Sequence, residues 1–200
     1  QVFTVSGMIW LAIAVLLLLL LAAAYCTAMH DIKTAVHLED NIFLSAKVAS
    51  PAVYGIIKPR IVLPVSDKGQ ENALVILHEK THIRTLDNLW RMLAFIFTCV
   101  HWFNPLVWIA FILSSKDMEM SCDEAVVLKL GTEIRADYTA SLLSLATGKR
   151  IIAGMPLAFG EGNTKGRIRN LANWKKPAFW VVLVAVIACI VLAVCLLTNP

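Results

Sequence analysis

The stretch "LHEKTHIRTLD", Leu77 to Asp87, lies between two long apolar runs and contains the pattern H-E-x-x-H. His78 and His82 are four residues apart, so on an α-helix both imidazoles project from one face and can bind one metal ion. Glu79 would lie beside the metal without binding it, where it can accept a proton from a zinc-activated water and pass it to a leaving amine. The preceding apolar "ALVIL" favours a helix. We therefore predict a zinc site with one open coordination position, rather than two ordinary histidines on an amphipathic helix.

Such a site needs a third ligand, and the other dense acidic stretch supplies a candidate. "SSKDMEMSCDEAVV", Ser114 to Val127, reads as a helix on which Glu119 and Asp123 are four residues apart on one face. We predict Glu119 as the third ligand and Asp123 as the acid that accepts the other ring N–H of a histidine. A solvated helix face is the alternative, and it is the weaker one beside an H-E-x-x-H motif.

Two further residues could compete for the metal. Cys122 lies off the face that carries Glu119 and Asp123, so we expect a small, buried, apolar role for it. His101 lies in "VHWFNP", a predicted turn, and we expect it to be structural.

The composition indicates a membrane protein. Hydrophobic residues make up 58% and charged residues 16% of the 200 residues, against about 45–50% and about 25% in a typical soluble domain. Two uncharged runs, Met8 to Met29 and Phe179 to Leu197, are each long enough to cross a bilayer. We predict transmembrane helices over residues 8–29 and 178–198. The chain begins at Gln1 and ends just after the second run, so we expect it to be a fragment.

The charges indicate the orientation of these spans. All 18 Lys and Arg residues lie between the two runs, from Lys33 to Lys176. By the positive-inside tendency, we expect residues 30–177 to be cytoplasmic and both termini to lie outside the cell membrane, in a multi-pass arrangement. The five cysteines form no C-x-x-C pair, which suits a reducing compartment.

A third apolar run, residues 92–113, contains "HWFNP" at its centre. If this run crossed the bilayer, His101 and Asn104 would lie in hydrocarbon, which is costly. Pro105 also disfavours a continuous helix at this point. We predict two helical pieces that meet at "HWFNP" and are either buried in protein or dip into the membrane.

The middle of the chain reads as a mainly helical α+β domain with a small β-sheet. β-branched segments predict strands, and Pro59 places the second of them at a sheet edge. Periodic apolar positions predict helices, with Ser66 or Asp67 as the N-cap of the first and Gly131 as the C-cap of the second. The predicted strands are Asn41–Val48 and Val53–Leu63. The first predicted helix begins after "SDKGQE" (66–71) and runs towards Trp90, and the others run from Ser114 to Leu130 and from Tyr138 to Gly148.

Taken in order, several segments resemble one known family. They are "VYGIIKPRIVLP" (53–64), "HEKTH…D" (78–87), "HWFNPLVW" (101–108), "KDMEMSCDEAV" (116–126) and "LAFGEGNTKGRIRNL" (157–171). Together they resemble the M56 family of membrane metallopeptidases, the BlaR1/MecR1-type proteins of bacterial antibiotic-response systems. The resemblance covers roughly residues 50–200.

The resemblance implies a gluzincin-type site, with His78, His82 and Glu119 on zinc, Glu79 as general base and Asp123 in support. It also implies a cytoplasmic protease domain next to the last membrane helix, and regulatory proteolysis of the protein itself, of a transcriptional repressor, or of both. The expected partners are thus the lipid bilayer and a protein substrate, without direct nucleic-acid contact, and a homodimer is compatible with this picture. Family members often carry a sensor domain after the last helix, and β-lactam sensing is not implied for this chain.

Two local features fit a protease. The Val53–Leu63 segment could pair with an extended substrate at the sheet edge. The stretch "GNTKGRIRNLANWKK", within residues 160–176, is basic and rich in Gly and Asn, as nicked segments often are. It is a candidate for self-cleavage, although an ordinary linker is the slightly better interpretation.

Other functions remain as alternatives. A non-catalytic membrane signal transducer with a structural or vestigial zinc site is the main one. An intramembrane protease is disfavoured because Lys80, Arg84 and Asp87 put charges on the motif helix. Two spans with a large polar insert give little support to a transporter or a channel.

Overall fold

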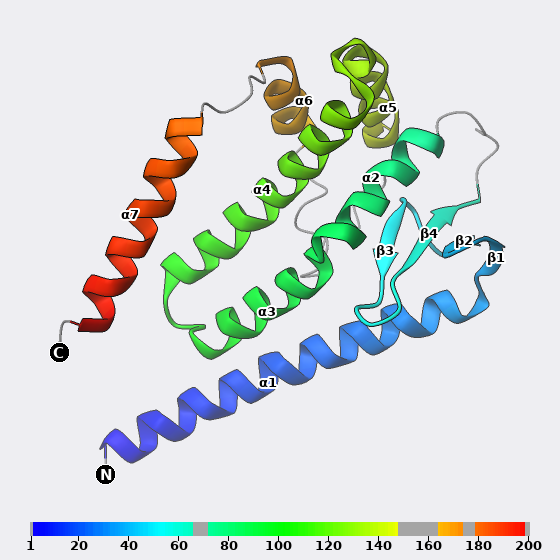
Figure 1. Cartoon of the computed structure of the whole chain (residues 1–200). Helices are drawn as coiled ribbons and strands as arrows, with labels where there is room; N and C mark the ends of the chain where they lie inside the picture. The colour runs from blue at the N-terminus through cyan, green and yellow to red at the C-terminus, as the bar shows by residue number, and fades with distance from the viewer. Residues whose placement is uncertain (1, 66–71, 148–163, 174–178, 199–200) are drawn as a thin grey trace.

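The computed structural model describes residues 2–65, 72–147, 164–173 and 179–198. The chain is mainly helical with one small mixed sheet (Figure 1). Its helices are α1 (Val2–Asp31), α2 (Asn72–Thr85), α3 (Asp87–Val100), α4 (Pro105–Leu130), α5 (Arg135–Thr147), α6 (Thr164–Asn173) and α7 (Phe179–Thr198). Short 3-10 turns cover Ile32–Thr34 and Thr132–Ile134.

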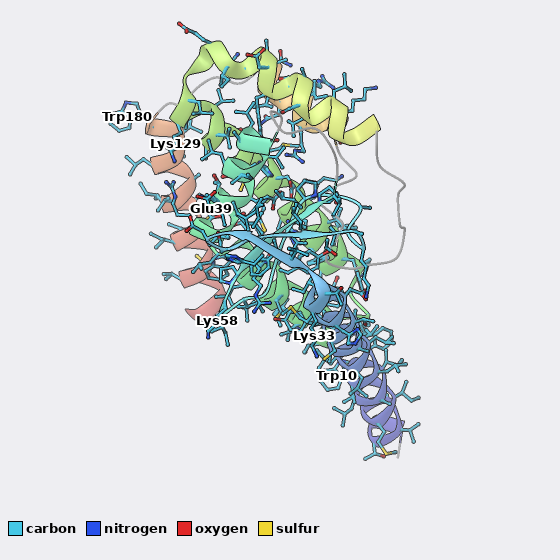
Figure 2. All side chains as sticks on the ribbon, turned by 90° about the vertical axis from the view of Figure 1, so that its right-hand side faces the viewer. Trp10, Lys33, Glu39, Lys58, Lys129 and Trp180 are labelled. Carbon is cyan, nitrogen blue, oxygen red and sulfur yellow. The ribbon has the colours of Figure 1, made fainter. Side chains whose placement is uncertain are left out.

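α1 is the long apolar helix at the N-terminal end. Within the described residues, Thr4–Thr34 is the one helical segment that is long and apolar enough to cross a bilayer, and only 11% of its most apolar window is buried. Figure 2 shows the projecting part of α1 with Trp10 on it, whereas Lys33 lies where the helix joins the body of the chain. The second predicted span is also a helix, α7, but its crossing of a membrane stays a prediction.

The sheet has the strand order β1-β2-β4-β3. Its strands are β1 (Val36–Glu39), β2 (Ile42–Ser45), β3 (Ala52–Tyr54) and β4 (Arg60–Pro64). β2 and β4 are parallel, while β1–β2 and β3–β4 are antiparallel. Sequence analysis missed β1: its residues V-H-L-E do alternate apolar and polar side chains, but the strand has only four residues and all four are exposed.

The predicted strand Val53–Leu63 is in fact a hairpin. Gly55 adopts φ +87, a left-handed conformation that ends β3. Pro59 therefore lies in the turn before β4 and not in an edge strand. β4 is a buried inner strand, and β3 is one of the two edge strands of the sheet, with β1 at the other edge.

The motif helix also differs from its prediction. It ends at Thr85 because Leu86 adopts φ 58, and α3 begins at Asp87 instead of continuing the same helix to Trp90. The predicted N-caps Ser66 and Asp67 lie outside the described residues.

The third apolar run is two helices joined at residues 101–104, as the sequence predicts. The side chain of Asn104 accepts a hydrogen bond from Leu106 N–H, and Pro105 occupies the first turn of α4, a favoured position for proline. α4 therefore begins at Pro105 rather than Ser114. It ends at Leu130, directly before Gly131, as expected.

Three apolar clusters hold these elements together. One joins α1 to α3 and α4 through Leu21, Phe95, Cys99 and Phe111. A second packs the sheet against α2. The third joins α4, α5 and α6 through Val126, Val127, Tyr138, Leu142 and Leu171. As a result, α2 and α4 lie side by side in the middle of the body (Figure 1).

The third cluster makes a stability prediction. Leu171 is completely buried in it, and Leu171→Ala should lower the free energy of unfolding by about 2–5 kcal/mol because it leaves a cavity. Denaturant unfolding of the chain in detergent micelles measures this loss. Leu128 on α4 is 52% exposed, so the control Leu128→Ala should change the unfolding free energy by less than about 0.5 kcal/mol. Equal losses in the two variants would contradict the packing.

Candidate metal centre

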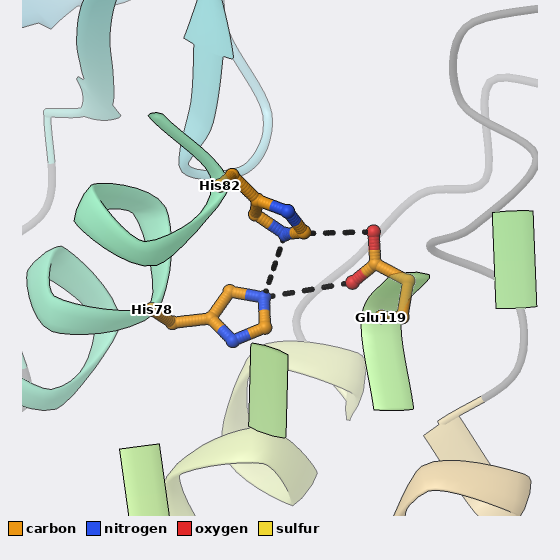
Figure 3. Close-up of side chains that lie close together, drawn as sticks. All are labelled: His78, His82 and Glu119. Atoms are coloured by element: carbon orange, nitrogen blue, oxygen red, sulfur yellow. Dashed lines mark hydrogen bonds and ion pairs between the residues drawn. The ribbon is translucent and has the colours of Figure 1, made fainter. Parts of the chain in front are cut away.

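The structure brings together the three residues that sequence analysis assigned to the metal (Figure 3). His78 and His82 project from one face of α2, and Glu119 reaches them from α4. His78 Nε2 and His82 Nε2 are 3.0 Å apart, and Glu119 oxygens lie 3.5 Å from the first and 3.7 Å from the second. Tetrahedral zinc with bonds of about 2.0–2.1 Å places its ligand atoms about 3.3 Å apart. The spacing therefore fits a zinc ion.

The outer nitrogen of His78 is bound by two side chains. His78 Nδ1 lies 2.9 Å from Tyr138 Oη and 3.3 Å from Asp123 Oδ1, and the Tyr138 hydroxyl donates to Asp123 at 2.7 Å. Nδ1–H can then donate, which leaves the lone pair of Nε2 directed toward the metal position. Asp123 thus lies next to His78 Nδ1, its role as the supporting acid stays a prediction, and Tyr138 is a contact that the sequence did not reveal.

The outer nitrogen of His82 has a different acidic partner. His82 Nδ1 donates to Asp87 Oδ2 at 2.6 Å, and both side chains are buried. Sequence analysis counted Asp87 only as a charge on the motif helix, whereas it is the buried first residue of α3. The left-handed Leu86 ends α2 and turns the first residue of α3 back toward His82. The one available signal was the position of this aspartate, five residues after the second histidine.

Cys122 belongs to this polar cluster as well. It is buried, as expected, but its thiol donates to Asp87 Oδ2 at 3.2 Å, and its Sγ lies 3.1 Å from His82 Nδ1. The expectation of an apolar role is therefore corrected. Burial raises the pKa of this thiol, which keeps it protonated. His101, the other rival ligand, lies in the α3–α4 turn, where its Nδ1 is 3.1 Å from Phe97 O.

Two arginines complete the centre, and sequence analysis assigned neither. Arg167 of α6 donates from Nε and Nη2 to both oxygens of Asp123, at 2.8 and 2.6 Å. Its Nη1 lies 3.3 Å from Glu119 Oε2, and Arg91 Nη2 lies 3.1 Å from Glu119 Oε1. Burial alone would raise the pKa of Glu119, but the hydrogen bonds from His78 and His82 and the charge of Arg167 hold it well below its usual value. The carboxylate is therefore ionised and able to bind a cation.

The formal charges of the centre favour a divalent cation. Four acids surround the two histidines, and two arginines oppose them. If the acids are ionised and the histidines neutral, two negative charges remain in a region shielded from water. The acids are Glu79, Asp87, Glu119 and Asp123, each less than 9% exposed. Without a metal, the nearby carboxylates outweigh burial and raise the pKa of both His78 and His82. A bound metal must therefore displace protons from this centre.

A cleft opens onto the three candidate ligands. Its walls come from the C-terminal end of α1, called here the base of α1, from the edge strand β3 and from α2, α5 and α6. Glu79 lies on this cleft beside His78 and has its own contacts within the protein. Asn88 at the start of α3 donates to Val53 O at 2.9 Å and to Gly55 O at 3.3 Å, which fixes β3 along the cleft.

The candidate self-cleavage stretch is partly helical. Residues 164–173 form α6, whose Arg167 and Leu171 are both buried, so this part is not an exposed loop. Four residues separate these two side chains, which places them on one face of the helix against α4 and α5. The remainder of the stretch lies outside the described residues.

Comparison with known proteins places this arrangement in a family. Residues 1–171 match the family model described as BlaR1 peptidase M56. The regulatory protein BlaR1 of Bacillus licheniformis is 28% identical over 155 residues, covering 73% of this chain and 26% of that protein. The methicillin resistance mecR1 protein of Staphylococcus aureus is 30% identical over 162 residues, covering 74% of this chain and 27% of that protein.

The chain therefore spans about a quarter of the length of these relatives. The family match extends from the first residue of α1 almost to the end of α6, and so includes every side chain of the candidate centre. The chain belongs to the M56 family of BlaR1-type peptidases.

Proposed function

We propose that this chain is a membrane-anchored zinc metalloendopeptidase with a gluzincin-type site formed by His78, His82 and Glu119. One observation carries the proposal. Three ligand atoms converge at zinc spacing, while buried carboxylates bind the outer nitrogen of each histidine. Such outer contacts orient metal-binding histidines and increase their basicity.

Zinc is the metal that this donor set favours. Two imidazoles and one carboxylate are typical of catalytic zinc sites, which leave a fourth position open. A zinc ion held there would polarise a peptide carbonyl and activate a water molecule. The two excess negative charges of the centre match its charge.

Glu79 is the proposed general base. It follows His78 directly on α2, is 8% exposed and faces the cleft. From this position its carboxylate would take a proton from the attacking water and deliver it to the nitrogen of the leaving amine. Arg167 and Arg91 would hold Glu119 ionised throughout, because both contact its carboxylate.

β3 is the proposed docking edge for an extended peptide. Its three residues, Ala52–Tyr54, line the cleft, and it is an outer strand of the sheet. A substrate strand could pair with its outer edge, next to the contacts that Asn88 makes with Val53 O and Gly55 O, and so present a peptide bond to Glu79. This moves the predicted docking edge from the Val53–Leu63 segment as a whole to β3.

The cellular role follows from the family and from the names of the relatives, one called a regulatory protein and the other a methicillin resistance protein. We propose that the chain acts in regulatory proteolysis, cutting itself, a transcriptional repressor, or both, without binding nucleic acid directly. α1 and α7 would cross the cell membrane. Residues 30–177 would then lie in the cytoplasm, and the two ends of the 200-residue chain would lie outside. Its partners would be the bilayer, the protein substrate and, in a homodimer, a second copy.

The first prediction from this proposal concerns zinc content. Purified chain should bind about one zinc ion, and His78→Ala or Glu119→Ala should abolish stoichiometric binding because each removes a ligand. Metal analysis after dialysis measures this. His30 is exposed and is not among the residues that line the cleft, so His30→Ala should retain full zinc content. Equal zinc in all three variants would rule out the assigned ligands.

The second prediction separates catalysis from metal binding. Glu79→Gln should retain zinc yet lower the rate of peptide cleavage by at least about 10²-fold, because the general base is lost. Zinc analysis and cleavage of a peptide library, followed by mass spectrometry, measure both quantities. Glu39→Gln makes the same change at an exposed position of β1 and should leave cleavage unchanged. Signalling that survives Glu79→Gln would instead favour the non-catalytic transducer.

The third prediction concerns the supporting acid. Asp123→Asn should weaken zinc binding by about 10–100-fold, because the amide no longer holds His78 as a carboxylate does. Competition with a fluorescent chelator gives the affinity. The control Asp117→Asn lies on the exposed side of the same helix and should bind zinc as the unchanged chain does. An unaltered affinity for Asp123→Asn would remove Asp123 from the site.

A further inference from the structure

The outer face of the α3–α4 pair is unusually apolar. Three large side chains of α3 and three of α4 recur at intervals of three and four residues, and each set forms one stripe. All are between 47% and 69% exposed, as is one phenylalanine in the turn. This surface, the hairpin face, consists of Trp90, Leu93, Phe97, Phe103, Leu106, Ile109 and Leu113. Contiguous apolar surfaces of this kind mark interaction sites.

The opposite face of the pair is apolar as well. Phe95, Cys99 and Phe111 are buried there against Leu21 of α1. No charged residue occurs within residues 92–115. A helix that is hydrophobic on all sides belongs in a protein core or in a membrane, and one side of this pair has no protein cover among the described residues.

The position of the pair along α1 favours a membrane over a protein core as the environment of its outer face. Away from its turn, the pair packs on Leu21 of α1. Next to its turn, Trp10 Nε1 of α1 donates to Val100 O at 2.9 Å. Trp10 and Leu21 are about 16 Å apart along α1. The pair thus lies beside the candidate membrane span Thr4–Thr34, with its turn toward the N-terminal end of α1 (Figure 1).

The polar groups of the turn are largely paired within the protein. Asn104 N–H donates to His101 O at 2.9 Å, and Asn104 Oδ1 accepts from Leu106 N–H at 3.0 Å. Trp108 Nε1 donates to Trp102 O at 2.9 Å. The indole N–H of Trp102 is an exception, being buried without a partner. Internal pairing of this kind is what non-helical backbone at membrane depth requires.

We propose that the α3–α4 pair enters the bilayer as a re-entrant hairpin, from the same side as the base of α1, and that lipid acyl chains cover the hairpin face. Residues 92–100 of α3 extend about 14 Å as a helix, roughly half of the hydrocarbon thickness of about 30 Å. The hairpin therefore turns back without crossing. Lipid is the occupant because the pair packs along the candidate membrane span, whose own apolar side chains, such as Leu16, Leu19 and Leu20, are also exposed.

The hairpin sets the depth of the metal centre. Arg91, the last charged residue before the apolar part of α3, contacts Glu119. The cleft is also lined by Tyr25, Ala28 and Met29 at the base of α1. The centre would lie at the membrane surface, and its substrate class would be peptide segments close to the bilayer. This consequence rests on the proposed peptidase function, whereas the insertion itself does not.

Spin labels test the insertion. Cys26, Cys189 and Cys195 are exposed and would be replaced with alanine, while the buried Cys99 and Cys122 remain. Single cysteines at Phe97, Leu106 or Ile109 would then be labelled, and the chain reconstituted in vesicles of phosphatidylcholine and phosphatidylglycerol. Electron paramagnetic resonance compares collisions with oxygen, which concentrates in hydrocarbon, and with a water-soluble nickel complex. Leu19 on α1 serves as the lipid reference, and Ile57, 93% exposed in the β3–β4 turn, as the water reference.

Labels on the hairpin should behave as the label at Leu19 does, with oxygen collisions in excess of nickel collisions. Nickel collisions equal to those at Ile57 would overturn the proposal, because the face would lie in water. Low collision rates with both reagents would also overturn it, because a second copy or another protein segment would cover the face. These measurements need neither zinc nor cleavage, so their failure is distinguishable from failure of the proposed function.

Discussion

The buried contact between Asp123 and Arg167 is the interaction on which the centre depends. Asp123 is fully buried, and its two oxygens meet Arg167 of α6, Tyr138 of α5 and His78 of α2. One carboxylate of α4 therefore joins three other helices. A buried charge pair of this type gives little net stability, but loss of one partner leaves an uncompensated charge and is costly. The contact thus selects one arrangement of the four helices, and that arrangement is the one in which His78 Nε2 faces Glu119.

The second histidine, His82, is held in a different way, through the break between helices α2 and α3. If α2 continued without a break, Asp87 would not lie against His82 Nδ1, because residues five apart do not share a helix face. The left-handed Leu86 changes the direction of the chain, and Asp87 returns to the ring at 2.6 Å. The same break starts α3, whose Asn88 holds β3 and whose Arg91 reaches Glu119. One backbone conformation therefore connects the histidine, the sheet edge and the third acid.

Sequence periodicity was sufficient for contacts within one helix and insufficient for contacts between distant segments. His78 with His82, and Glu119 with Asp123, share faces because they are four residues apart, and H-E-x-x-H chemistry selected the acidic helix as their partner. Arg167 is 89 residues from His78 along the chain, and no local pattern separates it from the other basic residues near it. The strand β1 and the break at Leu86 were missed because they depend on strand pairing and on a backbone conformation that leucine rarely adopts. The long helices and the α3–α4 turn were predictable because composition and Asn104-Pro105 act locally.

The membrane and the metal centre impose related physical constraints. Hydrocarbon and the shielded centre both penalise unpaired polar groups, and the chain changes from one environment to the other within a few residues of α3 and α4. Arg91 and Lys116 are the first charges on either side of the apolar hairpin, and Glu119 follows one turn after Lys116. Arg91 binds Glu119 at 3.1 Å, so the charge that ends the apolar part of α3 also balances a candidate metal ligand. A hairpin fixed in depth by its lipid contacts would hold this arginine, and with it Glu119, at a constant height relative to the membrane surface.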